Sequence, residues 1–389
     1  MKITMNNKII LTLAFILSPL FINAQTSIVK PDYLKFEIPD SMKTKVLVAL
    51  DSLFIGIDHK QIDSKLIDNS DFELNNYLLQ SLNGNENKDS IKNFYQRQLI
   101  NLYPVSQFEY TISIAYIGGN QQKPILGSIY NLMARYVDNR FVFSSTLKYL
   151  TKTWKTKVVG TMTYIYRDTL NLKRATECDI KNKTIATKLG LAPRPYFMYM
   201  CYNYQDFLHL VGCEYDINDN GKSNAGFIID PNYLFSVMNN EDFSHDIFHM
   251  YAWEIRKPKG RNFTAEEGIS YSWGNAYHAD YDNNIATQKE LVVGLQKYLK
   301  ENPNCDLLNL FDKNIRIYQY RSNRLSVKSV ISGIICDEIE RLKGIDGIKQ
   351  LIGCDKGDDN FFKCTNDLIK INRSNFNVEV KKLIDKIKK

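Results

Sequence analysis

The sequence lacks the patterns by which cysteine-rich and nucleic-acid-binding proteins are recognised. Its seven cysteines include no Cys-x-x-Cys pair, which excludes a thiolate zinc knuckle and a thioredoxin-type redox motif. The 50 basic and 43 acidic residues leave a net charge of only +7, and no basic run indicates a nucleic-acid partner. With 44% hydrophobic and 24% charged residues, the chain has the composition of a globular protein, and its 389 residues suggest two or three domains.

No apolar run is long enough to cross a bilayer, and the longest one lies at the N-terminus. Residues 1–24 are interpreted as a secretory signal peptide, because two lysines precede an apolar stretch that ends at the small residue Ala24. The stretch covers residues 9–22, which is shorter than the roughly 20 residues that a membrane-spanning helix needs. We therefore expect a secreted or periplasmic mature chain with no membrane span.

The cysteines leave several pairings open. Their number is odd, so at least one thiol is free or pairs with another chain. One or two disulfides are compatible with an oxidising compartment, and the pairs nearest in sequence are Cys354 with Cys364 and Cys201 with Cys213. Cys336 lies in an apolar helical pattern and fits a small buried hydrophobic residue.

Residues 25–166 are expected to form an N-terminal α+β region of unknown role. Met42–Ile57 has helical spacing, and the apolar residues from Phe108 to Tyr116 alternate strictly, which is the period of a half-buried strand. A second alternation between Val158 and Tyr166 closes this region. It contains no recognisable chemistry.

Residues 167–389 are expected to form a second domain, richer in helices. Its predicted elements are a helix over 170–189 capped by Gly190, a strand over 196–202, a short strand at 227–229, a helix from about 242 to 256, a helix from 327 to 342 that ends at Gly344, and a C-terminal helix from 376 to 387.

The segment Ser-His-Asp-Ile-Phe-His, residues 244–249, carries the most specific chemistry in the chain. On a helix, His245 and His249 are one turn apart, and side chains at i and i+4 lie about 5–6 Å apart at Cβ. Two imidazoles so placed can converge on one metal ion. A third ligand from the next helix would leave the fourth tetrahedral position for water.

This pattern resembles the gluzincin branch of zinc metallopeptidases, in which a His-Glu-x-x-His helix is followed by a helix with a ligand glutamate in the form Asn-Glu-Gly-aliphatic. Here Glu266-Glu267-Gly268-Ile269 matches that form, with 17 residues between His249 and Glu267. The resemblance implies Zn²⁺ held by His245, His249 and Glu267, and a peptide or protein substrate. It also implies a zincin-like domain, with a small mixed sheet, an active-site helix and a helical C-terminal lobe.

The sequence departs from the family at the general base, where Asp246 replaces glutamate in an HDxxH motif. Aspartate can take a proton from a metal-bound water, but its carboxylate lies roughly 1–1.5 Å short of the position that a glutamate reaches. A displacement of about 1 Å can cost on the order of a hundredfold in rate. The ligands are therefore better supported than the catalysis.

Other interpretations of the same residues stay open. Thr264-x-x-Glu267 also fits a capping box, in which the glutamate turns back to the backbone of its own helix, and Glu266 is an alternative ligand. Two histidines four residues apart can arise by chance. Tyr271 and His278 are candidate catalytic groups that would stabilise an oxyanion, although each is also an ordinary packed or solvated residue.

Three functional hypotheses follow. The first is a secreted zinc-dependent peptidase, in which Asp246 activates the zinc-bound water. The second is an exported zinc-binding pseudopeptidase or binding module on the same scaffold, inactive because Asp246 is too short. The third is a structural or surface protein that binds no metal.

Overall fold

The computed structural model describes residues 28–32, 34–83, 94–120, 123–222, 226–229, 232–256, 260–279, 284–322 and 324–387. The chain is of the α+β class and divides into two compact units. Unit 1 comprises the residues up to Ser144 together with Tyr215–Ile217, and unit 2 comprises Ser145–Glu214 and Asn218–Lys389. The expected signal peptide, residues 1–24, lies outside the described residues.

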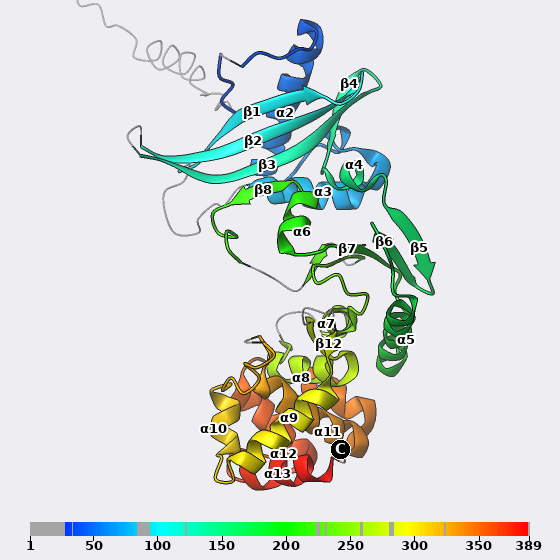
Figure 1. The fold of residues 1–389 in the computed structure, drawn as a ribbon, viewed down its shortest axis with the longest axis vertical. Helices are drawn as coiled ribbons and strands as arrows, with labels where there is room; N and C mark the ends of the chain where they lie inside the picture. Colours follow the sequence, from blue (N-terminus) through cyan, green and yellow to red (C-terminus); the bar gives the residue numbers. More distant parts are fainter. Residues whose placement is uncertain are drawn as a thin grey trace, which may run out of the picture. The chain divides into compact units, whose positions relative to one another are not determined.

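Unit 1 contains a sheet, whose strands β1 to β4 are antiparallel, and the helices α2 and α3 (Figure 1). The strands follow the order β1-β2-β3-β4, and β8 pairs with β3. The turn between β3 and β4 is made by Asp138 and Asn139, which both have positive φ, as the two-residue hairpin turn of type I′ requires. The elements are α2 (Asp40–Asp58), α3 (Phe72–Gln80), β1 (Gln96–Pro104), β2 (Glu109–Asn120), β3 (Lys123–Val137), β4 (Arg140–Ser144) and the second half of β8 (Cys213–Asp216).

Both elements that the sequence predicted in unit 1 are confirmed. The helix expected at 42–57 is α2, whose residues Leu50 and Leu53 are fully buried, and the strand expected at 108–116 is β2, whose residues Ile112 and Ile114 are fully buried. These residues belong to one hydrophobic cluster, so the periodicity of each element reflects the burial of one of its sides in this core.

The boundary between the units lies at Ser144, earlier than residue 166. The stretch from Val158 to Tyr166 is a hairpin of two strands, because Gly160 adopts a positive φ between them. Its second strand pairs in parallel with β7, so the hairpin belongs to the sheet of unit 2.

The sheet of unit 2 is mixed, in the order β5-β6-β7-β10-β9. The central strands pair in parallel, whereas β5 and β9 at the two edges are antiparallel to their neighbours. The short strand expected at 227–229 is therefore an edge strand. The strands are β5 (Lys155–Val159), β6 (Met162–Tyr166), β7 (Tyr196–Met200), β9 (Gly226–Ile229) and β10 (Tyr233–Ser236).

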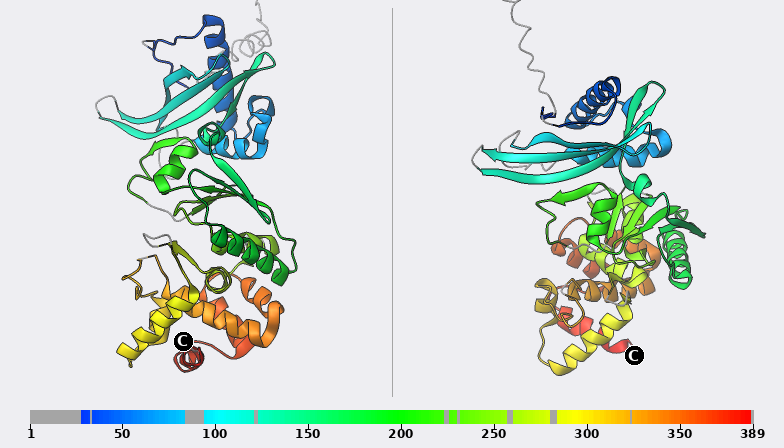
Figure 2. Two further views of the ribbon diagram at one scale, coloured as in Figure 1. Left: turned by 45° about the vertical axis from the view of Figure 1, so that its right-hand side comes forward. Right: turned by 45° about the horizontal axis from the view of Figure 1, so that its top comes forward.

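The rest of unit 2 is mainly helical, and α8 to α13 gather into one group, coloured yellow-green to red in Figure 2. The predicted helix before Gly190 is confirmed as α5, with the glycine as its left-handed cap. The helices are α4 (Leu147–Thr151), α5 (Leu172–Leu189), α6 (Tyr204–Leu210), α7 (Ser244–Ile255), α8 (Phe263–Gly274), α9 (Gln288–Glu301), α10 (Leu307–Asp312), α11 (Val327–Ile352), α12 (Asp358–Ile369) and α13 (Phe376–Lys386), with a two-stranded ribbon of β11 (Ala276–Ala279) and β12 (Ile285–Ala286).

Helices α8 and α11 approach closely because glycines face each other where they meet. A Cβ atom at Gly268 would lie 2.5 Å from Cβ of Ser332, and one at Gly333 would lie 2.9 Å from the carbonyl oxygen of Gly268. Side chains larger than hydrogen would push the helices apart. This contact fixes the rotation of α8 about its axis, and with it the direction of the neighbouring Glu267.

The long helix α11 is interrupted at Gly344, as the sequence predicted, but a second helical segment continues to Ile352. Gly344 has φ 64° and ψ −161°, which is not a helical conformation. The break turns the chain so that the carbonyl of Ile352 accepts a hydrogen bond of 2.8 Å from the backbone N–H of Asn262. The end of α11 thereby reaches the start of α8.

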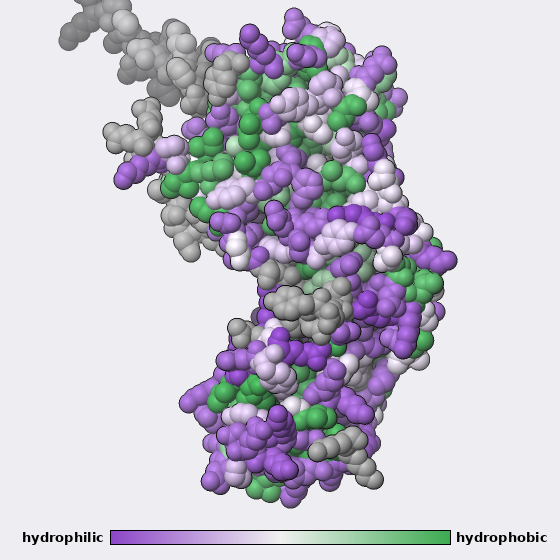
Figure 3. Space-filling model, in the orientation of Figure 1, coloured by the Kyte–Doolittle hydropathy of each residue, from purple (hydrophilic) through white to green (hydrophobic). Residues whose placement is uncertain are grey.

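The surface is mostly polar, and the apolar residues that it exposes are scattered in small groups (Figure 3). On the face drawn there, apolar residues gather over the sheet of unit 1. Ile125 and Leu126 of β3 in this sheet are exposed. Within the described parts of the chain, we find no helix that is both long and apolar enough to span a membrane.

The contact between α8 and α11 leads to a stability prediction. Gly268→Ala should lower the free energy of unfolding by about 1–3 kcal/mol, because the added methyl group overlaps the backbone of Ser332. Gly294→Ala in α9 is the matched control, since the nearest atom there is the hydroxyl of the exposed and movable Tyr320. Urea unfolding of the two variants measures the difference, and equal stabilities would contradict the proposed steric constraint.

Candidate metal centre

Helix α7 carries both histidines on one face and packs its opposite face into the hydrophobic core. Phe248 and Tyr251 are fully buried, whereas His249 is about one-fifth exposed. The hydroxyl of Tyr251 donates a hydrogen bond of 2.7 Å to the side chain of Asn182 on α5. Core packing and this directional bond together set the rotation of α7, so that His245 and His249 face α8.

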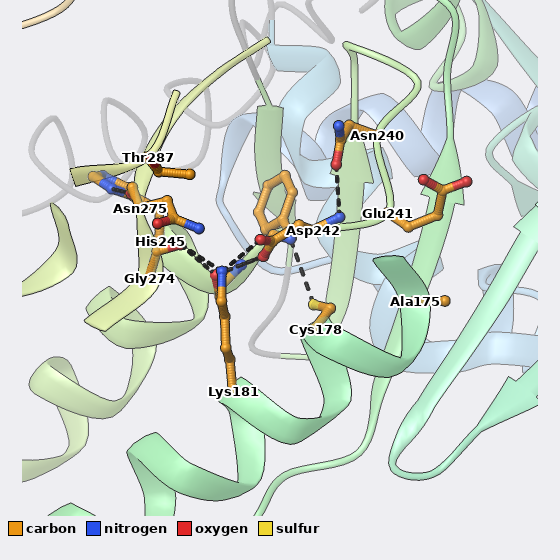
Figure 4. Close-up of polar contacts among 12 residues, drawn as sticks. Ala175, Cys178, Lys181, Asn240, Glu241, Asp242, His245, Gly274, Asn275 and Thr287 are labelled. Carbon is orange, nitrogen blue, oxygen red and sulfur yellow. Dashed lines mark hydrogen bonds and ion pairs between the residues drawn. The ribbon is translucent and has the colours of Figure 1, made fainter. Parts of the chain in front are cut away.

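Helix α8 runs antiparallel to α7, and its C-terminus lies against the N-terminus of α7. A Cβ atom at Gly274 would be 2.7 Å from the backbone nitrogen of His245, so only glycine allows this approach. The carbonyl oxygen of Gly274 accepts hydrogen bonds from Ser244 at 2.6 Å and from Lys181 at 3.2 Å. Figure 4 shows Lys181 between Asp242 and Gly274, which links α5 to the ends of both helices.

The side chains of His245, His249 and Glu267 converge. The two Nε2 atoms are 3.2 Å apart, and Glu267 places one carboxylate oxygen 3.3 Å from Nε2 of His249 and the other 3.8 Å from Nε2 of His245. Ligands at about 2.0–2.1 Å from a tetrahedral ion would be separated by about 3.3 Å. The three groups are thus spaced as ligands of one small divalent ion would be, and they form the one candidate metal cluster among the described residues.

Each histidine is oriented by a hydrogen bond at its other ring nitrogen. Nδ1 of His245 lies 2.9 Å from the carbonyl oxygen of Asn275, and Nδ1 of His249 lies 2.7 Å from a carboxylate oxygen of Glu266. Both partners accept hydrogen bonds, so each Nδ1 carries the proton. When a ring is neutral, as metal binding would require, its lone pair is then on Nε2, which is the atom directed at the centre.

The buried ion pair of Glu266 and Arg261 lies on the Nδ1 side of His249, opposite the atom that faces the cluster. Glu266 is completely buried, and Arg261 donates two hydrogen bonds to its carboxylate, one of them from Nε at 2.8 Å. Burial disfavours the charged carboxylate, but the hydrogen bonds from His249 and Arg261 outweigh it and lower the pKa of Glu266. The guanidinium is flanked by the rings of Trp253 and Phe263, whose centroids are 5.3 and 5.8 Å away. A carboxylate–histidine pair of this kind raises the basicity of a ligand imidazole.

The structure decides between the alternatives for the acidic residues of α8. The N-cap is Asn262, whose side chain accepts a hydrogen bond from the backbone of Ala265, and Thr264 lies inside the helix with its hydroxyl bonded to Asp358. The capping-box interpretation of Glu267 is therefore wrong. Glu266 faces Nδ1 of His249 and is not part of the cluster.

Charges at the site are arranged to hold a cation. Burial works against the protonated imidazole, but the carboxylates of Glu266 and Glu267 outweigh it and raise the pKa of His249 to about 10. Burial likewise works against the carboxylate of Glu267, yet the hydrogen bond from His249 and the charges of both histidines lower its pKa to about 2. In the metal-free chain a proton on His249 thus balances the carboxylates, and a divalent ion would take over that role.

Asp246 lies beside the three clustered side chains without a partner of its own. No described residue forms a hydrogen bond or ion pair with its carboxylate, although it interacts electrostatically with His245, His249 and Glu267. Burial and the negative charge of Glu267 raise its pKa, and the histidines oppose that rise. A carboxylate that is partly buried, unpaired and next to the cluster has the properties of a proton acceptor.

The two proposed oxyanion groups are placed differently. The ring of Tyr271 packs edge-on against His245 with 5.6 Å between centroids, and its hydroxyl accepts a hydrogen bond of 3.3 Å from the backbone of Ser326. Burial raises the pKa of Tyr271 to about 12. His278 lies in β11, and its side chain is outside the described residues. A catalytic role for either residue stays a prediction.

Sequence reasoning missed Arg261, Asn275 and the supporting role of Glu266. Glu266 and Arg261 are five residues apart, and a pair of opposite charges so close in sequence is common on protein surfaces. Asn275 acts through its backbone carbonyl, which carries no signature in the sequence. Gly274 was the one available signal, since a glycine at a helix end indicates a close approach or a cap.

No protein-family model matches this chain, and a comparison with curated proteins finds no match either.

The support of His249 by Glu266 leads to a prediction on metal affinity. If the cluster holds a divalent ion, Glu266→Gln should weaken its binding about 10- to 100-fold, because the amide is a poorer acceptor for the Nδ1 proton. Glu267→Gln, which removes a ligand, should weaken it more. Competition with a chelating dye measures both constants, and Glu254→Gln on the exposed side of α7 is the control. An unchanged affinity of Glu266→Gln would contradict the orienting role.

The charge arrangement predicts a pH dependence of the metal-free chain. Because the pKa of His249 rises from 6.5 to about 10 on folding, its contribution to stability is fully present below pH 6.5 and is lost as the pH rises through about 10. Urea unfolding in a chelator should show the stability advantage of wild type over His249→Gln shrinking between these values. Parallel pH profiles of the two proteins would contradict this assignment.

Proposed function

We propose that this chain is a secreted or periplasmic zinc-dependent peptidase of the gluzincin type. The observation that supports this most is the convergence of His245, His249 and Glu267 at separations of 3.2–3.8 Å, on two adjacent antiparallel helices. One acidic and two imidazole ligands are a common set for catalytic zinc, which keeps a further coordination position for water or substrate. Among metals, zinc suits this mixed set of nitrogen and oxygen donors.

Each residue has a distinct role in the proposed reaction. His245, His249 and Glu267 hold the ion, which when bound lowers the pKa of a water molecule toward 7 and polarises the peptide carbonyl. Asp246 accepts the proton of the attacking water and then passes it to the leaving amine. Glu266 and Asn275 keep the imidazoles in the required tautomer.

The mixed sheet is compatible with a zincin-like domain. Its edge strand β9 is antiparallel to β10, and no other strand of the described residues pairs with its second side. An extended peptide can add to such an edge through backbone hydrogen bonds. We propose that the substrate is a peptide or protein bound in this way.

A second candidate function is a zinc-binding pseudopeptidase or binding module. The replacement of glutamate by Asp246 favours it, because the shorter side chain has to reach the same water. Both candidates require the metal, and they differ only in whether Asp246 supports turnover.

The experiment that separates these functions varies Asp246 alone. We expect the wild type to bind about one Zn²⁺ per chain and to hydrolyse peptides from a mixed library. Asp246→Ala should retain the ion and lose hydrolysis by on the order of 10²–10⁴-fold, the usual contribution of a general base. Asp246→Glu should retain hydrolysis or increase it. Metal content and peptide cleavage, measured on the same samples, give both quantities.

Controls decide how each result is interpreted. His245→Ala should lose both the ion and the activity, whereas His209→Ala, which changes an exposed histidine on α6, should lose neither. A zinc-loaded wild type that cleaves nothing while Asp246→Glu does would favour the pseudopeptidase. A wild type that binds no zinc would reject both candidates.

A further inference from the structure

We infer that Lys181 is a positioning residue of the candidate metal centre, and that it acts through the backbone of Asn275 on the ring of His245. Lys181 lies on α5, outside the two helices that carry the clustered side chains. Its ammonium group donates hydrogen bonds to the carboxylate of Asp242 at 2.6 Å and to the carbonyl oxygen of Gly274 at 3.2 Å (Figure 4). For metal binding the inference rests on the proposed function, but the state of the ring is a property of the metal-free chain.

Two acceptors at the junction of α7 and α8 compete for one hydroxyl proton. The Oγ atom of Ser244 lies 2.5 Å from the carboxylate of Asp242 and 2.6 Å from the carbonyl oxygen of Gly274, but a serine has a single proton to donate. The charged carboxylate is the stronger acceptor. Without the ammonium group of Lys181, the proton therefore goes to Asp242, and the carbonyl of Gly274 loses the donors that the described side chains offer to it.

The residue that follows this carbonyl has a backbone conformation that needs support from its surroundings. Asn275 has φ 86° and ψ 165°, a region that residues other than glycine rarely occupy. Such a conformation persists only where neighbouring groups hold it. The carbonyl before Asn275, that of Gly274, is held by Lys181, and its own carbonyl oxygen lies 2.9 Å from Nδ1 of His245. The strained residue thus links the ammonium group to the imidazole.

Loss of the ammonium group should change the tautomer of one histidine. When the carbonyl of Gly274 is released, the peptide groups on both sides of Asn275 can rotate toward a relaxed conformation, and the acceptor at Nδ1 of His245 moves away. The neutral ring then distributes its proton between Nδ1 and Nε2, so that the lone pair no longer stays on Nε2. Nδ1 of His249 has a different acceptor, Glu266, and is therefore an internal control.

Nitrogen chemical shifts of the imidazole rings test the inference in the metal-free chain. The full chain is labelled with isotope-enriched histidine and kept in a chelator at a pH at which the ring of His245 is neutral. We expect a single Nδ1-protonated tautomer of His245 in the wild type and a mixture of tautomers in Lys181→Met, with unchanged signals from His249. Lys181→Arg, which keeps a charged group with several donors, should restore the single tautomer.

Lys183→Met is the matched control, because it breaks an ion pair of the same length, 2.6 Å, on the same helix. It should leave the signals of His245 as in the wild type. A single Nδ1-protonated tautomer in Lys181→Met would overturn the inference, since Asn275 would then be held without the ammonium group.

A second variant covers the case in which Lys181→Met does not fold. Removal of one partner of a buried ion pair leaves the other charge without compensation, here the carboxylate of Asp242. Lys181→Gln stays polar at this partly exposed position, but its shorter side chain cannot hold both acceptors. It should show the same mixture of His245 tautomers, and a single tautomer in this variant would equally reject the inference.

Zinc affinity separates this inference from the proposed function. If the cluster holds Zn²⁺, Lys181→Met should weaken binding about 10-fold, at the lower end of the effect of groups that orient a ligand histidine. Lys181→Arg should bind as the wild type does. A wild type that binds no Zn²⁺ would reject the proposed function, while the tautomer measurement still decides on Lys181. An unchanged affinity in a Lys181→Met chain with mixed His245 tautomers would reject the role in metal binding.

Discussion

The candidate centre depends on the antiparallel contact between α7 and α8. The absence of a side chain at Gly274 lets the end of α8 touch the backbone of His245, and this contact places the carbonyl of Asn275 at the ring of that histidine. Farther along the same pair of helices, His249 faces Glu266 and Glu267. This contact, the core packing of α7 and the glycine contact of α8 with α11 together set the orientation of the three clustered side chains.

Electrostatics and packing work together at this site. A fully buried carboxylate such as Glu266 is costly unless its charge is compensated, and Arg261 provides that compensation from the side remote from the cluster. His249 lies between this ion pair and Glu267, so it responds to negative charge on both sides. The exposed aromatic residues Trp253 and Phe263 flank the guanidinium, which keeps part of the ion pair away from water.

The sequence was sufficient to predict those elements whose structure follows from a local pattern of residues. Helix α5 with its cap at Gly190 and helix α7 were predicted because periodic burial and capping act over a few residues. The boundary at Ser144 was missed because it depends on the parallel pairing of β6 with β7, which are separated in the chain by α5. In the site, the spacing of the histidines was visible, but the acceptor at Asn275 was not, since any residue has a carbonyl group.

The interruption of α11 at Gly344 has a consequence for how this chain can vary. The first part of α11 packs on α8, and the second part ends at Ile352, whose carbonyl meets Asn262. Each residue of an α-helix adds a rotation of about 100° and a rise of about 1.5 Å. An insertion or deletion between Ser332 and Gly344 would rotate and shift the part of α11 that follows Gly344 relative to the part that packs on α8. The number of residues in this segment is therefore constrained as strictly as the chemical identity of any single one.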